Sequence, residues 1–310
     1  MDGFDLLVLG DANPDLVLTG GDVVPAFGQT ERLVDGARLT LGGSGAIMAA
    51  GAARLGLRVA FVGVVGSDDP GMLVREHLGA RGVDLRGLVV DPRGATGLSV
   101  ILARTDDRAI LTFPGTIGAL RGASVPRALL ADARHVHVAS YFLQRALAQD
   151  LPDLLAQRAP GATCSVDPNF DPAGRWDGGL KDLLPRIDVF LPNATEAMAI
   201  AGVDDATEAA RRLAEATPIV VVKDGAHGAI VAADGVVERV GPCRGVVTVD
   251  STGAGDSFDA GFVAARLAGA SPLEAAALAD ACGASSTRAI GGTDAQPTLE
   301  EARALAAGSA

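Results

Sequence analysis

The chain has 310 residues, of which 48% are hydrophobic and 21% charged, which provides for a buried core and excludes a disordered chain. Its formal net charge of −12 opposes binding to nucleic acid or to anionic lipid, so we expect neither partner. The longest apolar runs are short and the chain begins without a basic segment, so we expect no membrane span or secretory signal and a cytoplasmic protein.

Strand-like and helical runs alternate along most of the chain, which predicts an α/β fold with a mostly parallel central sheet flanked by helices on both faces. The predicted strands are 6–10, 59–64, 88–90, 136–139, 162–166, 189–191, 219–222 and the β-rich run 245–249. The predicted helices are 44–55, 69–78, 144–158, 208–216, one that follows the glycines of 253–255, and one from 273. No linker divides the chain, so residues 1–310 are expected to form one main domain.

Two stretches, at about 15–41 and 96–113, do not follow this alternation. Apolar residues alternate along 98–102, and a turn at Asp106-Asp107 precedes another strand-like run. We expect both stretches to form one small antiparallel sheet inserted into the main domain. Its unpaired strand edges make a homodimer through these strands a hypothesis.

The most informative motif is Asp250-Ser251-Thr252-Gly253-Ala254-Gly255-Asp256-Ser257-Phe258. Glycines let several backbone N–H groups converge, and a helix N-terminus adds positive potential, which together favour a phosphate or oxyanion. A carboxylate there would repel a resting phosphate, so Asp256 indicates a base for a hydroxyl aimed at a phosphoryl group. The alternative is that Asp256 only favours the first helical turn and the glycines only allow tight packing.

This nonapeptide resembles the C-terminal signature of the ribokinase-like, or PfkB-type, carbohydrate and nucleoside kinases, from which Ser251 alone departs. The resemblance implies a ribokinase-like fold, ATP and Mg²⁺ as cofactors, and the small sheet as a lid over the sugar that protects ATP from hydrolysis. It further implies that Asp256 is the catalytic base and that the backbone of Gly253, Ala254 and Gly255 forms the anion hole for the γ-phosphate.

Two N-terminal turns resemble the substrate-binding segments of that family. In Gly10-Asp11-Ala12-Asn13-Pro14-Asp15, the side chains of Asn13 and Asp15 suit the hydroxyls of a sugar, although such a turn also simply ends a strand. In the segment that begins Gly42-Gly43, paired glycines allow close approach of substrate, although they also serve packing. Ile47 stands at a substrate-contacting position where the family usually has asparagine, so the identity of the substrate cannot be copied from ribokinase.

Two further motifs resemble the nucleotide and Mg²⁺ sites of the family. Asn193 and Glu196 match its Asn-x-x-Glu motif, which implies nucleotide binding by Asn193 and water-mediated Mg²⁺ binding by Glu196; the same pair also forms a helix-capping box. Lys223, Gly225 and Gly228 match its nucleotide loop, although a Gly-x-x-Gly turn is also an ordinary hairpin.

Other features are less specific. Asp250 and Thr252 resemble a monovalent-cation site, which would hold K⁺, and Thr252 is also expected to contact the nucleotide. Asp280 is a candidate for the position beside adenine. Alternating His135 and His137 have no cysteine or carboxylate nearby in sequence, which favours a structural role over zinc binding. Three widely separated cysteines indicate reduced thiols.

The sequence therefore predicts an ATP-dependent kinase of a small sugar or related alcohol. A nucleoside kinase stays open because apolar Ile47 could contact a base. A keto-sugar-acid kinase would need a cation such as Arg104 or Arg175. From a different class, a non-catalytic sugar sensor is disfavoured by the intact Asp256. No Gly-x-x-x-x-Gly-Lys-Ser/Thr motif is present, which excludes a P-loop kinase.

Overall fold

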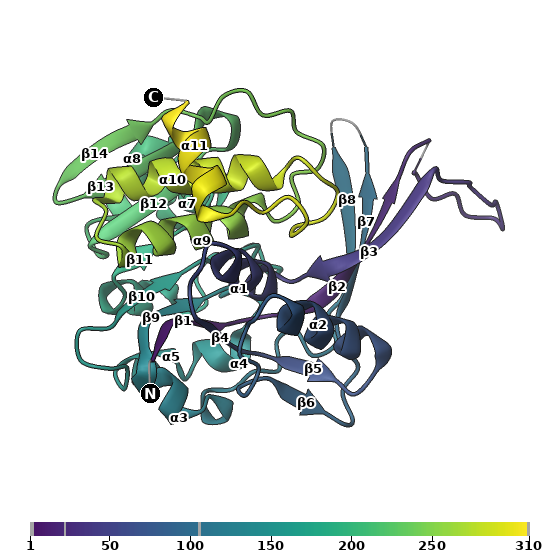
Figure 1. The fold of residues 1–310 in the computed structure, drawn as a ribbon, viewed down its shortest axis with the longest axis horizontal. Coiled ribbons are helices and arrows are strands. Elements are labelled where there is room, and N and C mark those ends of the chain that lie inside the picture. Colours follow the sequence, from purple (N-terminus) through teal and green to yellow (C-terminus); the bar gives the residue numbers. More distant parts are fainter. Residues whose placement is uncertain (1–2, 22, 105–106, 309–310) are drawn as a thin grey trace.

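The computed structural model describes residues 3–21, 23–104 and 107–308, so Asp106 of the expected turn lies outside the described residues. Its main element is an eight-stranded sheet in the order β14-β13-β12-β11-β10-β9-β1-β4, which runs through the centre of the molecule (Figure 1). The strands are β1 (Phe4–Leu9), β4 (Val59–Val62), β9 (Ala133–Val138), β10 (Thr163–Val166), β11 (Val189–Phe190), β12 (Ile219–Lys223), β13 (Ala229–Ala233) and β14 (Val236–Val240). Neighbours from β4 to β12 are parallel, and β13 and β14 complete the sheet as an antiparallel hairpin.

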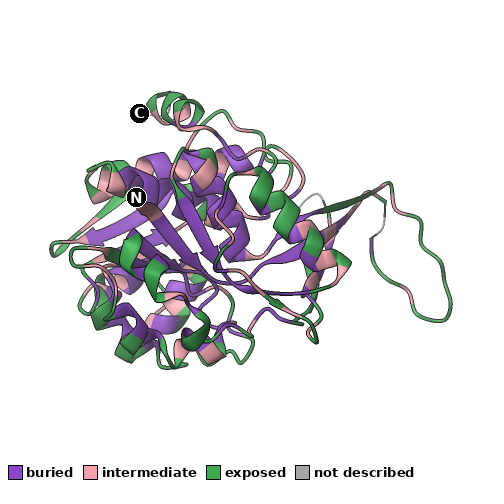
Figure 2. Cartoon of the chain, turned by 60° about the horizontal axis from the view of Figure 1, so that its bottom comes forward, coloured by how far each residue is buried: buried purple, intermediate pink, exposed green. Residues whose placement is uncertain are grey.

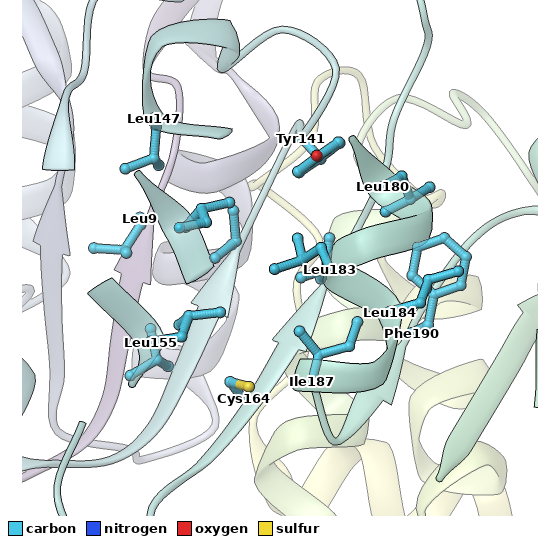
Figure 3. Packing of buried hydrophobic residues seen from close by; sticks show 14 of the residues in the cluster. Leu9, Tyr141, Leu147, Leu155, Cys164, Leu180, Leu183, Leu184, Ile187 and Phe190 are labelled. Carbon is cyan, nitrogen blue, oxygen red and sulfur yellow. The ribbon is translucent and has the colours of Figure 1, made fainter. Parts of the chain in front are cut away.

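Helices cover both faces of this sheet because the strand side chains point alternately to each face. In β1, Leu6 and Val8 join one core and Leu7 and Leu9 the other. The first core contains α1 (Ser44–Arg54), α2 (Asp69–Ala80), α9 (Ala254–Leu267), α10 (Pro272–Ser286) and α11 (Leu299–Ala307). The second contains α3 (Arg127–Asp132), α4 (Arg145–Ala148), α5 (Leu151–Leu155), α6 (Leu180–Leu183), α7 (Ala194–Ala201) and α8 (Ala206–Leu213). Figure 2 shows the strands buried between helices with exposed outer faces, and Figure 3 shows the packing of the second core around Cys164 and Phe190. The predicted fold class is confirmed.

A separate four-stranded sheet, called the small sheet below, projects from the body (Figure 1). It consists of β2 (Asn13–Thr19), β3 (Gly36–Gly42), β7 (Leu98–Ala103) and β8 (Arg108–Phe113), in the order β3-β2-β7-β8. The expectation of a purely antiparallel sheet is wrong at its centre. Two antiparallel pairs, from distant parts of the chain, meet where β2 and β7 run in the same direction.

Three predicted elements differ in the structure. Run 245–249 is an exposed loop, in which the N–H groups of Val249 and Asp250 bond to the Thr287 carbonyl instead of a strand neighbour. The predicted helix 144–158 is divided into α4 and α5, because Pro152 cannot donate a backbone hydrogen bond. Finally, β6 (Val89–Asp91) pairs with β5 (Val64–Gly66) outside the main sheet.

The topology creates a crevice at the carboxyl ends of the parallel strands. The chain leaves β1 for β4 on one side and later returns to β9 on the other side, and ligands of open α/β sheets bind at such a switch point. Polar residues follow the strands there, namely Asp11 after β1, Ser140 near the end of β9 and Asp167 after β10, with Lys223 ending β12. Among the helices of the described residues, none combines the length and apolar character required to cross a bilayer.

Candidate active site

The N-terminal turn of α9 presents free backbone donors. Gly253 caps the helix with a positive φ of 71°, and the Ala254 N–H bonds to the Ser251 carbonyl at 3.3 Å. Within the described part of the chain, the N–H groups of Gly255 and Asp256 have no hydrogen-bond acceptor. These two donors lie at the positive end of a 14-residue helix, which makes this turn the candidate anion site.

Asp256 lies in the same turn and is partly buried. Its Oδ1 accepts a hydrogen bond from the hydroxyl of Ser44, the first residue of α1. Burial and the negative charge of Asp167 raise the pKa of Asp256 to about 7, while the Ser44 bond and the Lys223 charge act in the opposite direction. A carboxylate with this pKa, held beside a hydroxyl and an anion site, can exchange a proton near neutral pH.

The substrate-side candidates converge at the start of the small sheet. Asn13 donates to the Asp15 carboxylate at 3.0 Å, and both side chains are buried. Burial and the nearby charge of Asp11 raise the pKa of Asp15 to about 7. A Cβ on Gly42 would lie 2.1 Å from Cγ of Asp15, so only glycine leaves room for this carboxylate.

The side chain of Ile47 packs against Gly253 and Gly292, at the N-terminal turn of α9. It is 3% exposed, and its Cγ2 would lie 3.0 Å from a Cβ on Gly253. A Cβ on Gly292 would lie 2.6 Å from its Cδ1. Ile47 therefore supports the anion-site turn from behind, where its side chain has little surface left for a ligand.

Asn193 and Glu196 form the capping box of α7. The Asn193 Oδ1 accepts from the Glu196 N–H at 2.9 Å, and a Glu196 carboxylate oxygen accepts from the Asn193 N–H at 2.9 Å. Burial and the charge of Asp167 raise the pKa of Glu196 to about 7, although Lys223 opposes this effect. Both the backbone and the side chain of Asn193 hydrogen bond to the Glu196 carboxylate, which holds it at the start of α7.

A cavity of about 390 Å³ extends from the anion site along α9 and α10. Of the predicted nucleotide residues, Lys223, Gly225 and Gly228 line this cavity, and so does Asp280. Asn193 and Thr252 are not among the described residues that line it. Burial raises the pKa of Asp280, whose carboxylate accepts a hydrogen bond from the Cys243 N–H.

The loop around Asp250 is tied to the small sheet by an arginine. Asp250 accepts from the N–H and hydroxyl of Thr252 at 2.9 and 2.7 Å, and from the Gly291 N–H at 2.8 Å. Arg108, on β8, donates to the Ser251 hydroxyl at 2.8 Å and lies 4.0 Å from Asp250 Oδ1. The small sheet therefore contacts the loop that leads into the anion site.

The two histidines belong to a buried polar chain. His135 contacts Thr163 and Ser165, and His137 contacts Ser165, all at 2.7–2.8 Å. Burial lowers the pKa of His135 to about 3 and of His137 to about 4, so both are neutral. Over the described residues, no group of three or more His, Cys, Asp or Glu side chains is arranged to hold a metal ion.

Several residues at the site lacked a recognised sequence signal. Asp11 accepts from the N–H groups of Ser44 and Gly45, and Asp167 contacts Lys223. Both aspartates directly follow predicted strands, so the strand-end rule could have identified them. Arg108 offered no such signal, because its contact depends on how the small sheet lies over the body.

Comparison with known proteins shows the family of the chain. The family model described as pfkB family carbohydrate kinase matches residues 4–299. The chain is 33% identical to an ATP-dependent ribose-1-phosphate kinase of Halopiger xanaduensis, covering 90% of each protein, and 30% identical to the ribokinase of Haemophilus influenzae, covering 96% of each. Its fold is similar to that of an E. coli protein provisionally named ribokinase II and solved with ATP and Mg²⁺, with a TM-score of 0.84, 24% identity, and coverage of 97% of this chain and 98% of that one. The chain therefore belongs to the pfkB family of carbohydrate kinases.

Proposed function

We propose that the protein transfers the γ-phosphate of ATP to a sugar hydroxyl at the N-terminal turn of α9. This proposal rests on two features that occur in one helical turn. They are the free N–H groups of Gly255 and Asp256 and the side-chain carboxylate of Asp256. The amides would bind the phosphoryl oxygens, and the carboxylate would accept the proton of the attacking hydroxyl. Ser44 shows that a hydroxyl can reach this carboxylate.

In this reaction the sugar oxygen forms a bond to the γ-phosphorus as its proton passes to Asp256. The bond between the γ-phosphorus and the oxygen that bridges it to ADP breaks, and ADP leaves with the electron pair. With a pKa of about 7, Asp256 is substantially ionised at neutral pH and can still hold the proton afterwards.

Glu196 fits a role in holding Mg²⁺. Its carboxylate is buried, and the neighbouring charge of Asp167 makes a cation favourable there. When bound, Mg²⁺ neutralises charge on the phosphate oxygens. A single carboxylate that acts through water is consistent with the lack of a cluster of metal ligands among the described residues. A K⁺ ion at Asp250 stays a prediction, since Arg108 already brings positive charge to that loop.

The structure favours a sugar over the other substrate classes. Buried Asn13 and Asp15 offer hydrogen-bonding groups to hydroxyls beneath the small sheet. Ile47 is buried behind Gly253 and has little surface with which to contact a nucleobase. Arg175 faces solvent beside Asp177, so it is not held ready for the carboxylate of a sugar acid.

The small sheet also supports a homodimer. Large apolar side chains of its edge strands are exposed, namely Leu39 on β3 and Ile110, Leu111 and Phe113 on β8. Pairing with a second copy would bury these side chains and satisfy the edge of β8. We propose that two small sheets meet in this way.

The function is tested by ADP release with a panel of sugars, ribose 1-phosphate, sugar acids and nucleosides, each with wild type and Asp256→Asn. We expect one sugar or sugar phosphate to stimulate ADP release, and the substitution to reduce that rate by about a hundredfold or more. A nucleoside as the preferred acceptor, or full activity of the variant, would refute the corresponding part of the proposal.

A further inference from the structure

Lys223 forms the centre of a buried ion-pair cluster below the anion site. Its Nζ lies 2.6 Å from Asp167 Oδ2, and 3.1 and 3.3 Å from the two oxygens of Asp259. The side chains are only 11%, 7% and 1% exposed, in the order Lys223, Asp167 and Asp259. The three residues come from β12, the end of β10 and α9, so the cluster joins the sheet to the helix that carries Asp256.

The cluster lies directly beside the phosphate-binding turn. A Cβ placed on Gly255 would be 3.5 Å from the Lys223 Nζ. Asp259 follows Asp256 by three residues on α9, and residues at this spacing lie on the same helix face. A charge on Lys223 therefore acts at short range on the free N–H groups and on the Asp256 carboxylate.

The hydrogen bonds of Lys223 indicate how it acts. The ammonium of Lys223 donates to Asp167 Oδ2 and to both carboxylate oxygens of Asp259, and the buried side chain has little freedom to turn toward a ligand. A lysine that binds a nucleotide phosphate directly would need to give up these contacts. Doing so would leave buried Asp167 without its cation, which is strongly unfavourable.

We propose that Lys223 is a positioning residue that acts on phosphoryl transfer through its ion pairs with Asp167 and Asp259, and does not bind the nucleotide directly. This inference rests on the proposed function and deepens it. Lys223 balances the charge of Asp167 below the anion site, so that the turn remains attractive to phosphate and Asp256 can ionise. It also fixes the first turns of α9 against the strand ends.

The electrostatics of the cluster agree with this role. Burial opposes ionisation of Asp167, but the adjacent ammonium more than offsets this and lowers its pKa. Burial raises the pKa of Asp259 well above its usual range, whereas the Lys223 charge acts in the opposite direction. The charged and titratable groups around Asp256 and the cluster are Asp11, His137, Asp167, Glu196, Lys223 and Asp259.

The test is a set of pH profiles of kcat/KM, measured for sugar-dependent ADP release at saturating Mg²⁺ and ATP. Lys223→Met leaves the Asp167 charge uncompensated, which raises the pKa of Asp256. We therefore expect the acid limb, the low-pH side of the profile where activity falls, to move to higher pH by about one unit. Adding Asp167→Asn to this variant removes the unbalanced charge, and we expect the limb to return toward the wild-type position. Lys181→Met is the matched control, because Lys181 is the other lysine of the chain and is exposed on α6.

Two further variants guard against simple misfolding. Lys223→Arg retains the charge, and we expect it to keep the wild-type acid limb. Asp259→Asn should shift the limb less than Asp167→Asn alone, because Asp167 is the charge that most raises the pKa of Asp256. Thermal melts of all variants identify any that do not fold, and the double variant is expected to be more stable than Lys223→Met.

The inference is overturned if Lys223→Met raises the KM for ATP without moving the acid limb, or if Asp167→Asn fails to rescue it, since a direct phosphate ligand would behave in this way. Failure of the proposed function looks different. In that case wild type itself would show no acceptor-dependent ADP release at any pH.

Discussion

Substitution of Gly253 by alanine is the sharpest structural perturbation of the anion site. Gly253 has a φ of 71°, in the left-handed region where a side chain costs about 1 kcal/mol. The new Cβ would lie 2.7 Å from Gly292 Cα, 3.0 Å from Ile47 Cγ2 and 3.1 Å from the Gly292 carbonyl oxygen. Backbone atoms cannot rotate away, so the turn itself must shift, which adds about 1–3 kcal/mol as in other overpacked sites.

Displacing this turn would move the Gly255 and Asp256 N–H groups away from the position proposed for the phosphoryl oxygens. Loss of one such donor in other enzymes costs about a hundredfold in kcat. We therefore expect Gly253→Ala to lower kcat of acceptor-dependent ADP release by about a hundredfold. Denaturant unfolding should show a destabilisation of about 2–4 kcal/mol, the sum of the two contributions.

Gly202→Ala is the matched control. Gly202 caps the C-terminus of α7 with a φ of 67°, and a Cβ there would meet no atom within 4 Å. This variant carries the left-handed conformation without the clash, so we expect a loss of about 1 kcal/mol of stability and wild-type kcat. Equal stability losses in the two variants, or wild-type kcat in Gly253→Ala, would refute the reasoning.

Three further predictions concern the base, the small sheet and the assembly. Protonated Asp256 cannot accept a proton, so kcat/KM of wild type should fall about tenfold per pH unit well below pH 7 and level off above it; a flat profile from pH 5 to 8 would contradict the assignment. Arg108→Ala removes the contact of β8 with Ser251, so we expect kcat/KM to fall about tenfold and ATP hydrolysis in the absence of sugar to rise. Arg93→Ala is the control, because Arg93 is exposed and its loss should change neither rate. Leu111→Glu should convert a dimer into a monomer in light scattering, because this side chain is 61% exposed on the edge strand, and a monomeric wild type would disprove the dimer.

Much of the fold follows from local patterns in the sequence. Alternating buried strands and amphipathic helices predict a parallel sheet, and the glycines before Asp256 predict the N-terminal turn of α9. Predicted elements were wrong where tertiary contacts override the local preference of the sequence for a strand or a helix. The β-branched run 245–249 pairs with no strand among the described residues, and the amides of Val249 and the following Asp250 bond to the Thr287 carbonyl instead.

Residues of the candidate site were predictable where one motif specifies both a backbone conformation, such as a helix start, and a reactive or hydrogen-bonding side chain. Gly253 and Asp256 are of this kind, and so is the Asn193–Glu196 capping box. The ion pairs of Lys223 were not predictable, because its partners Asp167 and Asp259 are distant in sequence and meet only when β10, β12 and α9 pack together. The packing of Ile47 against Gly253 and Gly292 was likewise not predictable from the local sequence, and its contact with substrate stays a prediction.

The central claim is that Asp256 accepts the proton of the attacking sugar hydroxyl. Single-turnover phosphoryl transfer by Asp256→Asn, with saturating ATP, Mg²⁺ and sugar, tests it most directly, because binding and product release do not limit the rate. We expect a transfer rate at least about a hundredfold below that of wild type, with ATP affinity retained. A single-turnover rate close to that of wild type would contradict it.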